Sequence, residues 1–219
     1  MAQSIGSLAS FGADGWDWRG TAYAGGPWES DGSLSLGFFD IADAAVERWK
    51  AGRRNDGIVI PIIYNYRHGV ELTLKEGIRA AGACVRDDGS ADAAVQAGEV
   101  DKWLSGTHSI GKLVNRLSSL LGRLHLGTGN ELPAETLYVL GKLHMLDQHG
   151  QAFRYSAVKT GAPDGERILE RIRPGEERFD LIAVAEALRD AGTMVLHGVS
   201  GVLRDYADYR ADMRYAAGL

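Results

Sequence analysis

Arg67 and His68 are adjacent side chains whose chemistry suits a phosphate group. They stand on the polar side of a strongly periodic helical segment, close to Glu71. Arginine binds phosphate oxygens and histidine transfers protons near neutral pH, so the pair predicts a polar pocket for phosphate chemistry. Arg154, in the sequence FRYS, is a further candidate because a strand could direct it toward the same helix.

A structural interpretation of these residues is also open. The i,i+4 spacing lets charges pair along the helix surface in the series Arg67, Glu71, Lys75 and Arg79. The segment would then be a salt-bridged face that packs against the hairpin or another subunit. Arg154 would be solvated or paired with Glu71.

Two nearby motifs resemble nucleotide-binding and nucleophile loops but lack required parts. Residues 106–112 have the glycine and lysine spacing of a phosphate-binding loop, yet Leu113 replaces the hydroxyl that would bind magnesium. Ser109, in THSIG, has no alternating strand–helix pattern around it, as a nucleophile elbow requires. We therefore expect Thr107 or Ser109 to cap a helix.

The sequence indicates neither a metal site nor a cofactor. No two of the six histidines lie three or four residues apart on one helix, and Cys84 is the only cysteine. A single cysteine also excludes an intrachain disulfide and favours a reducing compartment.

Helical periodicity accounts for most of the chain after residue 37. Apolar spacing and helix-start signals predict helices over residues 38–51, 61–81, about 109–124, 133–146 and, capped by Asp180, a long last segment. Gly192, Gly198 and Gly201 could divide that last helix. Alternation and turn residues predict a small β-hairpin near residues 152–172.

Residues 1–37 differ from the rest of the chain. They are rich in Gly, Ser and Asp yet include Trp16, Trp18, Tyr23 and Trp28. We expect an extended arm whose tryptophans anchor on the body or on a partner subunit. The predicted fold class is therefore all-α: a bundle of four or five principal helices over residues 38–219, with this arm and the hairpin.

Composition favours a cytoplasmic protein with no membrane contact. The net charge is -5, so no general basic field would draw the chain to nucleic acid or anionic lipid. The amino terminus lacks a basic start and an apolar run, and residues 58–63, the longest apolar run, are interrupted by Pro61.

Two segments together resemble the HEPN superfamily of prokaryotic helical domains. The sequences are YRHGVELTLKEGI at residues 66–78 and THSIGKLVNRL at residues 107–117. HEPN members often pair a helix of the form A-x-E-L-x-L-K with a later helix opened by H-D-L. The matching positions here are Gly69, Glu71, Leu72, Leu74 and Lys75, followed by His108, Ser109 and Ile110.

The segment FRYSAVKTG also resembles the arginine–tyrosine hairpin of some such proteins. Together these segments cover about half the chain. The resemblance implies a helical bundle, commonly a symmetric dimer, in toxin–antitoxin, abortive-infection or antiphage contexts.

Many relatives are metal-independent ribonucleases in which an arginine is followed, after four to six residues, by a histidine. In this chain Arg189 and His197 are separated by seven residues, which places them about two helical turns apart. The candidate catalytic residues are therefore Arg67, His68, His108, Arg154, Arg189 and His197.

Two functions follow as expectations. In the first, a HEPN-like defence or toxin protein, expected to be a homodimer, binds or cleaves RNA or takes a nucleotide. A histidine would deprotonate the ribose hydroxyl and an arginine would stabilise the phosphorane. In the second, the domain is a catalytically silent dimeric interaction, immunity or adaptor module whose protein partner is encoded by an adjacent gene.

Overall fold

The computed structural model describes residues 22, 24, 26–161 and 167–218. Most of the expected amino-terminal arm, including Trp16, Trp18 and Tyr23, lies outside this range. Trp28 is described, and it is almost fully exposed rather than packed on the helices. The expected anchoring of the arm is therefore not seen at this tryptophan.

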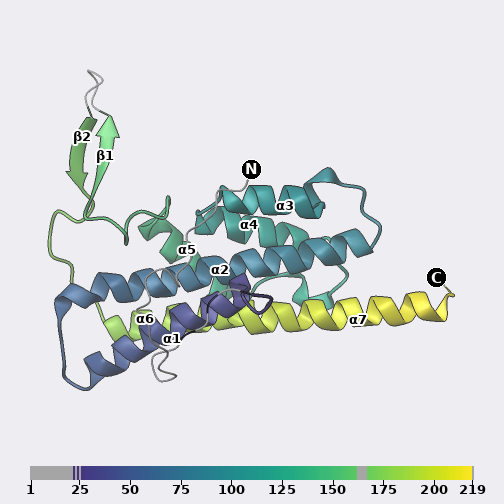
Figure 1. Ribbon diagram of the computed structural model, residues 1–219, viewed down its shortest axis with the longest axis horizontal. Helices are drawn as coiled ribbons and strands as arrows, with labels where there is room; N and C mark the ends of the chain where they lie inside the picture. Colours follow the sequence, from purple (N-terminus) through teal and green to yellow (C-terminus); the bar gives the residue numbers. More distant parts are fainter. Residues whose placement is uncertain (1–21, 23, 25, 162–166, 219) are drawn as a thin grey trace, which may run out of the picture.

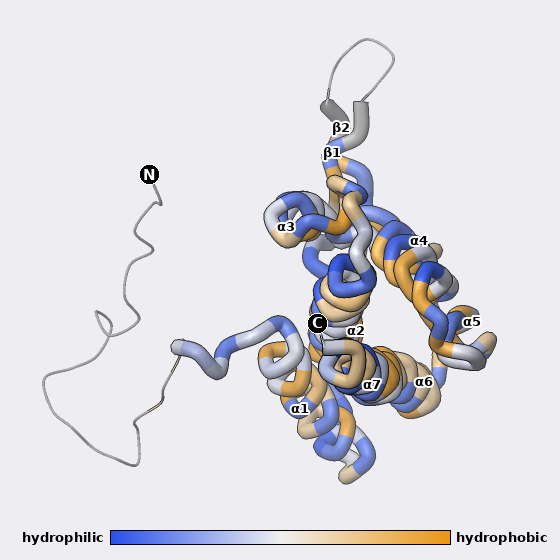
Figure 2. Tube along the Cα trace, turned by 90° about the vertical axis from the view of Figure 1, so that its right-hand side faces the viewer, coloured by the Kyte–Doolittle hydropathy of each residue, from blue (hydrophilic) through white to orange (hydrophobic). Residues whose placement is uncertain are grey.

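The long helix α2 (Val59–Asp87) is the central element of the fold. It packs against α1 (Asp31–Lys50), α3 (Ala97–Ser105), α4 (Ile110–Leu121), α6 (Leu181–Thr193) and α7 (Ser200–Ala216). The end-on view places α2 in the middle of these helices, while α5 (Ala134–Leu146) lies outside, against α4 and α6 (Figure 2). Short 3₁₀ turns cover Asp56–Ile58, Ala93–Val95 and Gly127–Asn130.

The expected apolar stripe of α2 is buried throughout, at Ile63, Tyr66, Val70, Leu74 and Ile78. The opposite side differs from the expectation of surface charge pairing, because it too is largely buried. A helix surrounded by other helices has little surface left for water, so its charged side chains must find partners inside the protein.

Helix α1 begins seven residues earlier than the sequence pattern indicated. Ser30 caps it, and the side chains of Ser30 and Ser33 each accept a hydrogen bond from the other's backbone N–H. This reciprocal cap starts the helix in a stretch whose glycines and serines are otherwise poor helix formers. The boundary placed at residue 37 therefore falls inside a helix.

The last helical segment is interrupted, as its glycines suggested. Asp180 caps α6 by accepting hydrogen bonds from the backbone N–H groups of Ile182 and Ala183. A π-helical stretch, Met194–Val199, then joins α6 to α7. The cap of α4 is also confirmed, because the Ser109 side chain accepts the backbone N–H of Lys112.

The all-α class with a small hairpin is confirmed. Strands β1 (Ala157–Gly161) and β2 (Arg167–Arg171) pair antiparallel, with Lys159 opposite Leu169. The hairpin projects from the helices above the amino-terminal half of α2 (Figure 1). Among the described residues, no helix is both long enough and apolar enough to span a bilayer.

Candidate functional site

A buried carboxylate, that of Glu71, lies at the centre of the polar side of α2. Its Oε1 is 2.9 Å from Lys75 Nζ and 2.9 Å from His108 Nδ1, and its Oε2 accepts a hydrogen bond from Arg67. Arg67, Glu71 and Lys75 meet because i,i+4 spacing places them on one stripe of the helix. His108 comes from the turn before α4.

Arg67 is occupied by acceptors of its own chain. Besides Glu71, it donates to the carbonyl oxygen of His108, and its Nε lies 2.8 Å from Asp147 Oδ2. Its side chain is only 3% exposed. The guanidinium therefore joins α2 to the turns before α4 and after α5, and it is not presented to a solute.

Asp147, which sequence reasoning missed, fixes the loop after α5. Its Oδ1 accepts the backbone N–H groups of Gln151 and Ala152, at 2.7 and 2.9 Å. Gly150 lies in the same loop with φ +74°, and a Cβ there would come within 3.0 Å of the Arg67 guanidinium. The signal in the sequence was an aspartate directly after a helix, with a glycine three residues later.

The charges of this cluster balance, since Arg67 and Lys75 face Glu71 and Asp147. Burial by itself would raise the pKa of Glu71, but Lys75, Arg67 and His108 together hold it below its ordinary value. Glu71 is therefore ionised at neutral pH despite being buried.

His108 is the member of this cluster that reaches solvent, with a side chain 53% exposed. An ionised Glu71 can only accept a hydrogen bond, so the Nδ1 of His108 carries the proton that points at it. In the neutral ring this leaves Nε2 with a free lone pair. A buried carboxylate that orients an exposed imidazole is an arrangement suited to general base catalysis.

His68 lies one residue beyond Arg67 but in a different environment. Its ring stacks on Tyr64 at 5.8 Å and meets the edge of Phe38 at 4.4 Å. Partial burial, with the positive charges of Arg67, Lys75 and Arg154, lowers its pKa below the ordinary value. The ring is thus neutral at pH 7 and packed between aromatic side chains.

Arg154 is exposed, and its guanidinium lies 5.5 Å from the centre of the Tyr155 ring. It forms no ion pair with Glu71, so of the two structural alternatives it agrees with the solvated one. Its positive charge contributes to the lowered pKa of His68. Arg154 therefore remains available to a ligand.

The structure brings neither Arg189 nor His197 into this cluster by any contact among the described residues. Arg189 lies 3.4 Å from Asp43 and over the Phe39 ring at 5.0 Å, and Asp43 also accepts the Tyr66 hydroxyl. His197 is exposed in the π-helical stretch. Arg189 of α6 thus contacts α1 and helps to hold the two helices together.

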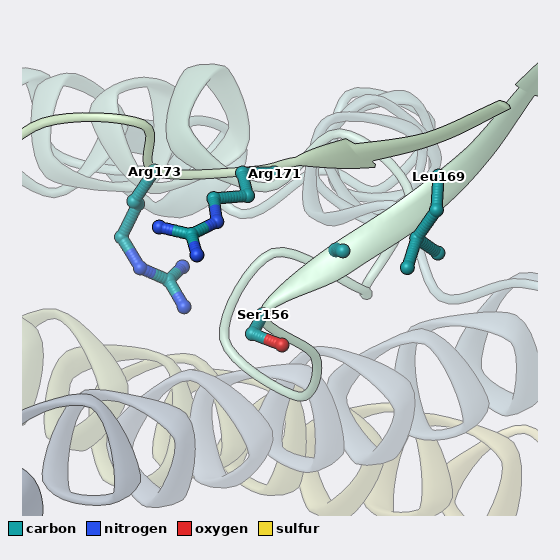
Figure 3. A pocket seen from close by; sticks show the side chains of 5 residues that line it. Ser156, Leu169, Arg171 and Arg173 are labelled. Carbon is teal, nitrogen blue, oxygen red and sulfur yellow. The ribbon is translucent and has the colours of Figure 1, made fainter.

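A pocket of about 390 Å³ opens beside the hairpin base, lined by Ser156, Ala157, Leu169, Arg171 and Arg173. Figure 3 shows the guanidinium groups of Arg171 and Arg173 side by side above Ser156. Sequence reasoning singled out neither arginine, although their spacing of two residues would place both side chains on one face of an extended segment.

No group of three or more His, Cys, Asp or Glu side chains that could hold a metal ion occurs in the described part of the chain. Comparisons with protein-family models, with curated proteins and with solved structures each found no match.

Proposed function

We propose that this chain is a HEPN-like bundle of four or five principal helices that binds RNA and cleaves it through His108. The observation that carries the proposal is the Glu71–His108 pair, in which a buried carboxylate orients a half-exposed imidazole. Arg154 supplies an exposed positive charge that forms no ion pair within the described residues, and this charge contributes to the lowered pKa of His68. Arg67 and Lys75 keep Glu71 ionised and do not touch the RNA.

In this mechanism His108 Nε2 takes the proton of a ribose 2′-hydroxyl. The 2′-oxygen then attacks the adjacent phosphorus while the bond to the 5′-oxygen breaks, and the leaving oxygen takes a proton from water. Arg154 stabilises the negative charge that develops on the phosphoryl oxygens. The products are a 2′,3′-cyclic phosphate and a 5′-hydroxyl end.

The test is His108→Gln, assayed on single-stranded RNAs of varied sequence. We expect cleavage to fall by about 10² to 10⁴, the usual contribution of a general base, while the affinity for RNA stays within about twofold of the original. The cyclic phosphate end should be detectable in the products of the unmodified protein.

His197→Gln and His125→Gln are the matched controls, since both histidines are exposed and lie outside the cluster. Both variants should retain cleavage. Loss of cleavage in His197→Gln, with full activity in His108→Gln, would instead place the chemistry at the late helix.

The defence or toxin setting rests on the resemblance to HEPN proteins. Expression of the unmodified protein should slow cell growth, and His108→Gln should relieve that effect. A nucleotidyltransferase gene adjacent to the gene for this chain would support a toxin–antitoxin pair.

A second function, a dimeric interaction module, is favoured by the outer face of α5. Tyr138, Met145 and Leu146 are each about two-thirds exposed there, and Leu137 is partly exposed. Between them Gly141 faces open space, so another helix could approach closely. Exposed apolar side chains gathered on one helix are typical of a protein interface, here with a second copy of this chain.

A further inference from the structure

The two faces of the β-hairpin differ in charge. Residues directly opposite one another in an antiparallel pair point to the same face, and alternate residues point to opposite faces. The pairs Ala157–Arg171 and Lys159–Leu169 therefore share one face, while Val158–Glu170 lies on the other. One face is cationic with an apolar centre, and the acidic side chain is on its back.

The cationic groups of this face are available for binding. Lys159 and Arg171 are exposed, and neither contacts an acidic side chain within the described residues. Several arginines of the helical body differ in this respect, since Arg79, Arg123 and Arg210 are paired with carboxylates. Exposed cations with no acidic partner among the described residues create a local positive potential that the net charge of the chain does not suggest.

Arg173 extends the cationic face to the hairpin base and is held in place. It donates hydrogen bonds to the carbonyl oxygens of Ala152 and Tyr155. With Arg171 and the hydroxyl of Ser156 it lines the pocket described above (Figure 3). Two guanidinium groups and a hydroxyl in one open pocket suit a phosphodiester group.

Exposed apolar and aromatic side chains accompany these charges. Leu169 lies at the centre of the cationic face and is largely exposed. Tyr155, directly before the pocket, is half exposed. Alternation of cations with apolar or aromatic surface is the pattern that binds single-stranded nucleic acid, because bases stack while phosphates pair with the charges.

The hairpin base is connected to His108 by a continuous set of contacts. Arg173 bonds to Ala152, whose backbone N–H is bound by Asp147, and Asp147 pairs with Arg67. Arg67 in turn bonds to the backbone of His108. A partly buried series of hydrogen bonds and one ion pair therefore connects the pocket to the backbone of His108.

We propose that Lys159 and Arg171, together with Arg173, bind the phosphodiester backbone of single-stranded RNA that flanks the bond cleaved at His108, and that Leu169 contacts its bases. This inference rests on the proposed function, and it assigns the hairpin to substrate binding and His108 to the chemical step. Double-stranded RNA would be bound less well, because its bases are not free to stack on Tyr155 or Leu169.

The experiment compares Lys159→Ala/Arg171→Ala with Arg48→Ala/Arg204→Ala, which removes the same charge from exposed arginines of α1 and α7. Binding of a fluorescent single-stranded RNA is measured by anisotropy over a range of salt concentrations, and cleavage is measured separately. The hairpin variant should bind at least about tenfold more weakly, with a shallower salt dependence, by about 1.4 in the log–log slope. The control pair should stay within about threefold.

The outcomes separate the two proposals. Hairpin-dependent binding without cleavage by any variant would support this inference and overturn catalysis at His108. Cleavage that requires His108 but is unchanged in rate, KM and affinity by the hairpin variant would overturn this inference alone. Absence of RNA binding by the unmodified protein would overturn both, and equal affinity for single-stranded DNA would overturn the assignment to RNA.

Discussion

At the scale of single residues, Glu71 decides what the polar side of α2 can do. Its carboxylate is shared by Arg67, Lys75 and His108, and all but His108 are withdrawn from solvent. Buried charges of this kind are stable only as a complete set, because removing one partner leaves another desolvated and unpaired. His108, the exposed member, is therefore the side chain of this set that can act on a ligand.

Glu71→Gln should therefore destabilise the protein by about 3–5 kcal/mol at pH 7, since Arg67 and Lys75 lose their shared counter-charge. The pKa of Glu71 in the folded protein lies below its ordinary value of 4.5. Its stabilising effect is thus present above pH 4.5 and is lost as the pH falls through the lower, folded-state pKa. Urea unfolding measured from pH 7 to pH 3 should show that the two proteins differ less in free energy of unfolding as the pH falls.

Glu76→Gln is the control, because Glu76 lies on the same helix and makes no ion pair within the described residues. It should change the free energy of unfolding by no more than about 0.5 kcal/mol. A Glu71→Gln effect as large at pH 3 as at pH 7 would contradict the role given to the ionised carboxylate.

At the scale of elements, the close packing of three helices depends on glycines around one aromatic ring. Phe39 of α1 is fully buried between Gly69 of α2 and Gly192 of α6. A Cβ at position 192 would lie 2.3 Å from Phe39 Cζ, far inside contact distance. These glycines are therefore required by packing and not by backbone conformation.

Gly192→Ala should lower the free energy of unfolding by about 1–3 kcal/mol, because the overpacked ring must move. Gly37→Ala is the matched control: position 37 lies in α1, faces open space, and should gain about 0.5–1 kcal/mol from the higher helix propensity of alanine. Both are measured by urea denaturation. Equal stabilisation by the two substitutions would show that Phe39 does not limit the approach of α6.

At the scale of the whole molecule, the hairpin and the outer face of α5 are two surfaces with exposed side chains that could bind a ligand. The hairpin projects from the helical body (Figure 1), and α5 lies on the outside of that body (Figure 2). The first surface is cationic and the second apolar, so they suit different ligands. RNA on the hairpin and a second copy on α5 are compatible with one another.

Tyr138→Glu should dissociate a homodimer formed through α5, because it places a charge in the middle of the apolar face. Sedimentation velocity over a range of concentrations measures the change from dimer to monomer. Tyr209→Glu on α7 is the control, since Tyr209 is similarly exposed. Dissociation by Tyr209→Glu alone would move the interface to α7, and a monomer before any substitution would exclude the homodimer.

The sequence by itself determined most of the helices and the hairpin, because their signals are local. The apolar stripe of α2, the caps at Ser109 and Asp180 and the alternation near residue 157 each depend on neighbours a few residues away. The start of α1 was predicted too late because its serine cap lies in a glycine-rich stretch. His108 became a candidate through the resemblance to HEPN proteins, and Arg154 through the expected strand. Neither signal indicated how close these side chains lie to Glu71.

Only the tertiary structure decided which side chains face solvent. The sequence left open whether Arg67 binds a ligand or pairs within the protein. It is buried because segments 41 and 80 residues further along the chain bring the His108 carbonyl and Asp147 onto it. The meeting of Arg171 and Arg173 with Ser156 in one pocket likewise depends on strand register and on the Ala152 and Tyr155 carbonyl oxygens that hold Arg173. Such contacts depend on how distant segments pack, and no periodicity within either segment encodes them.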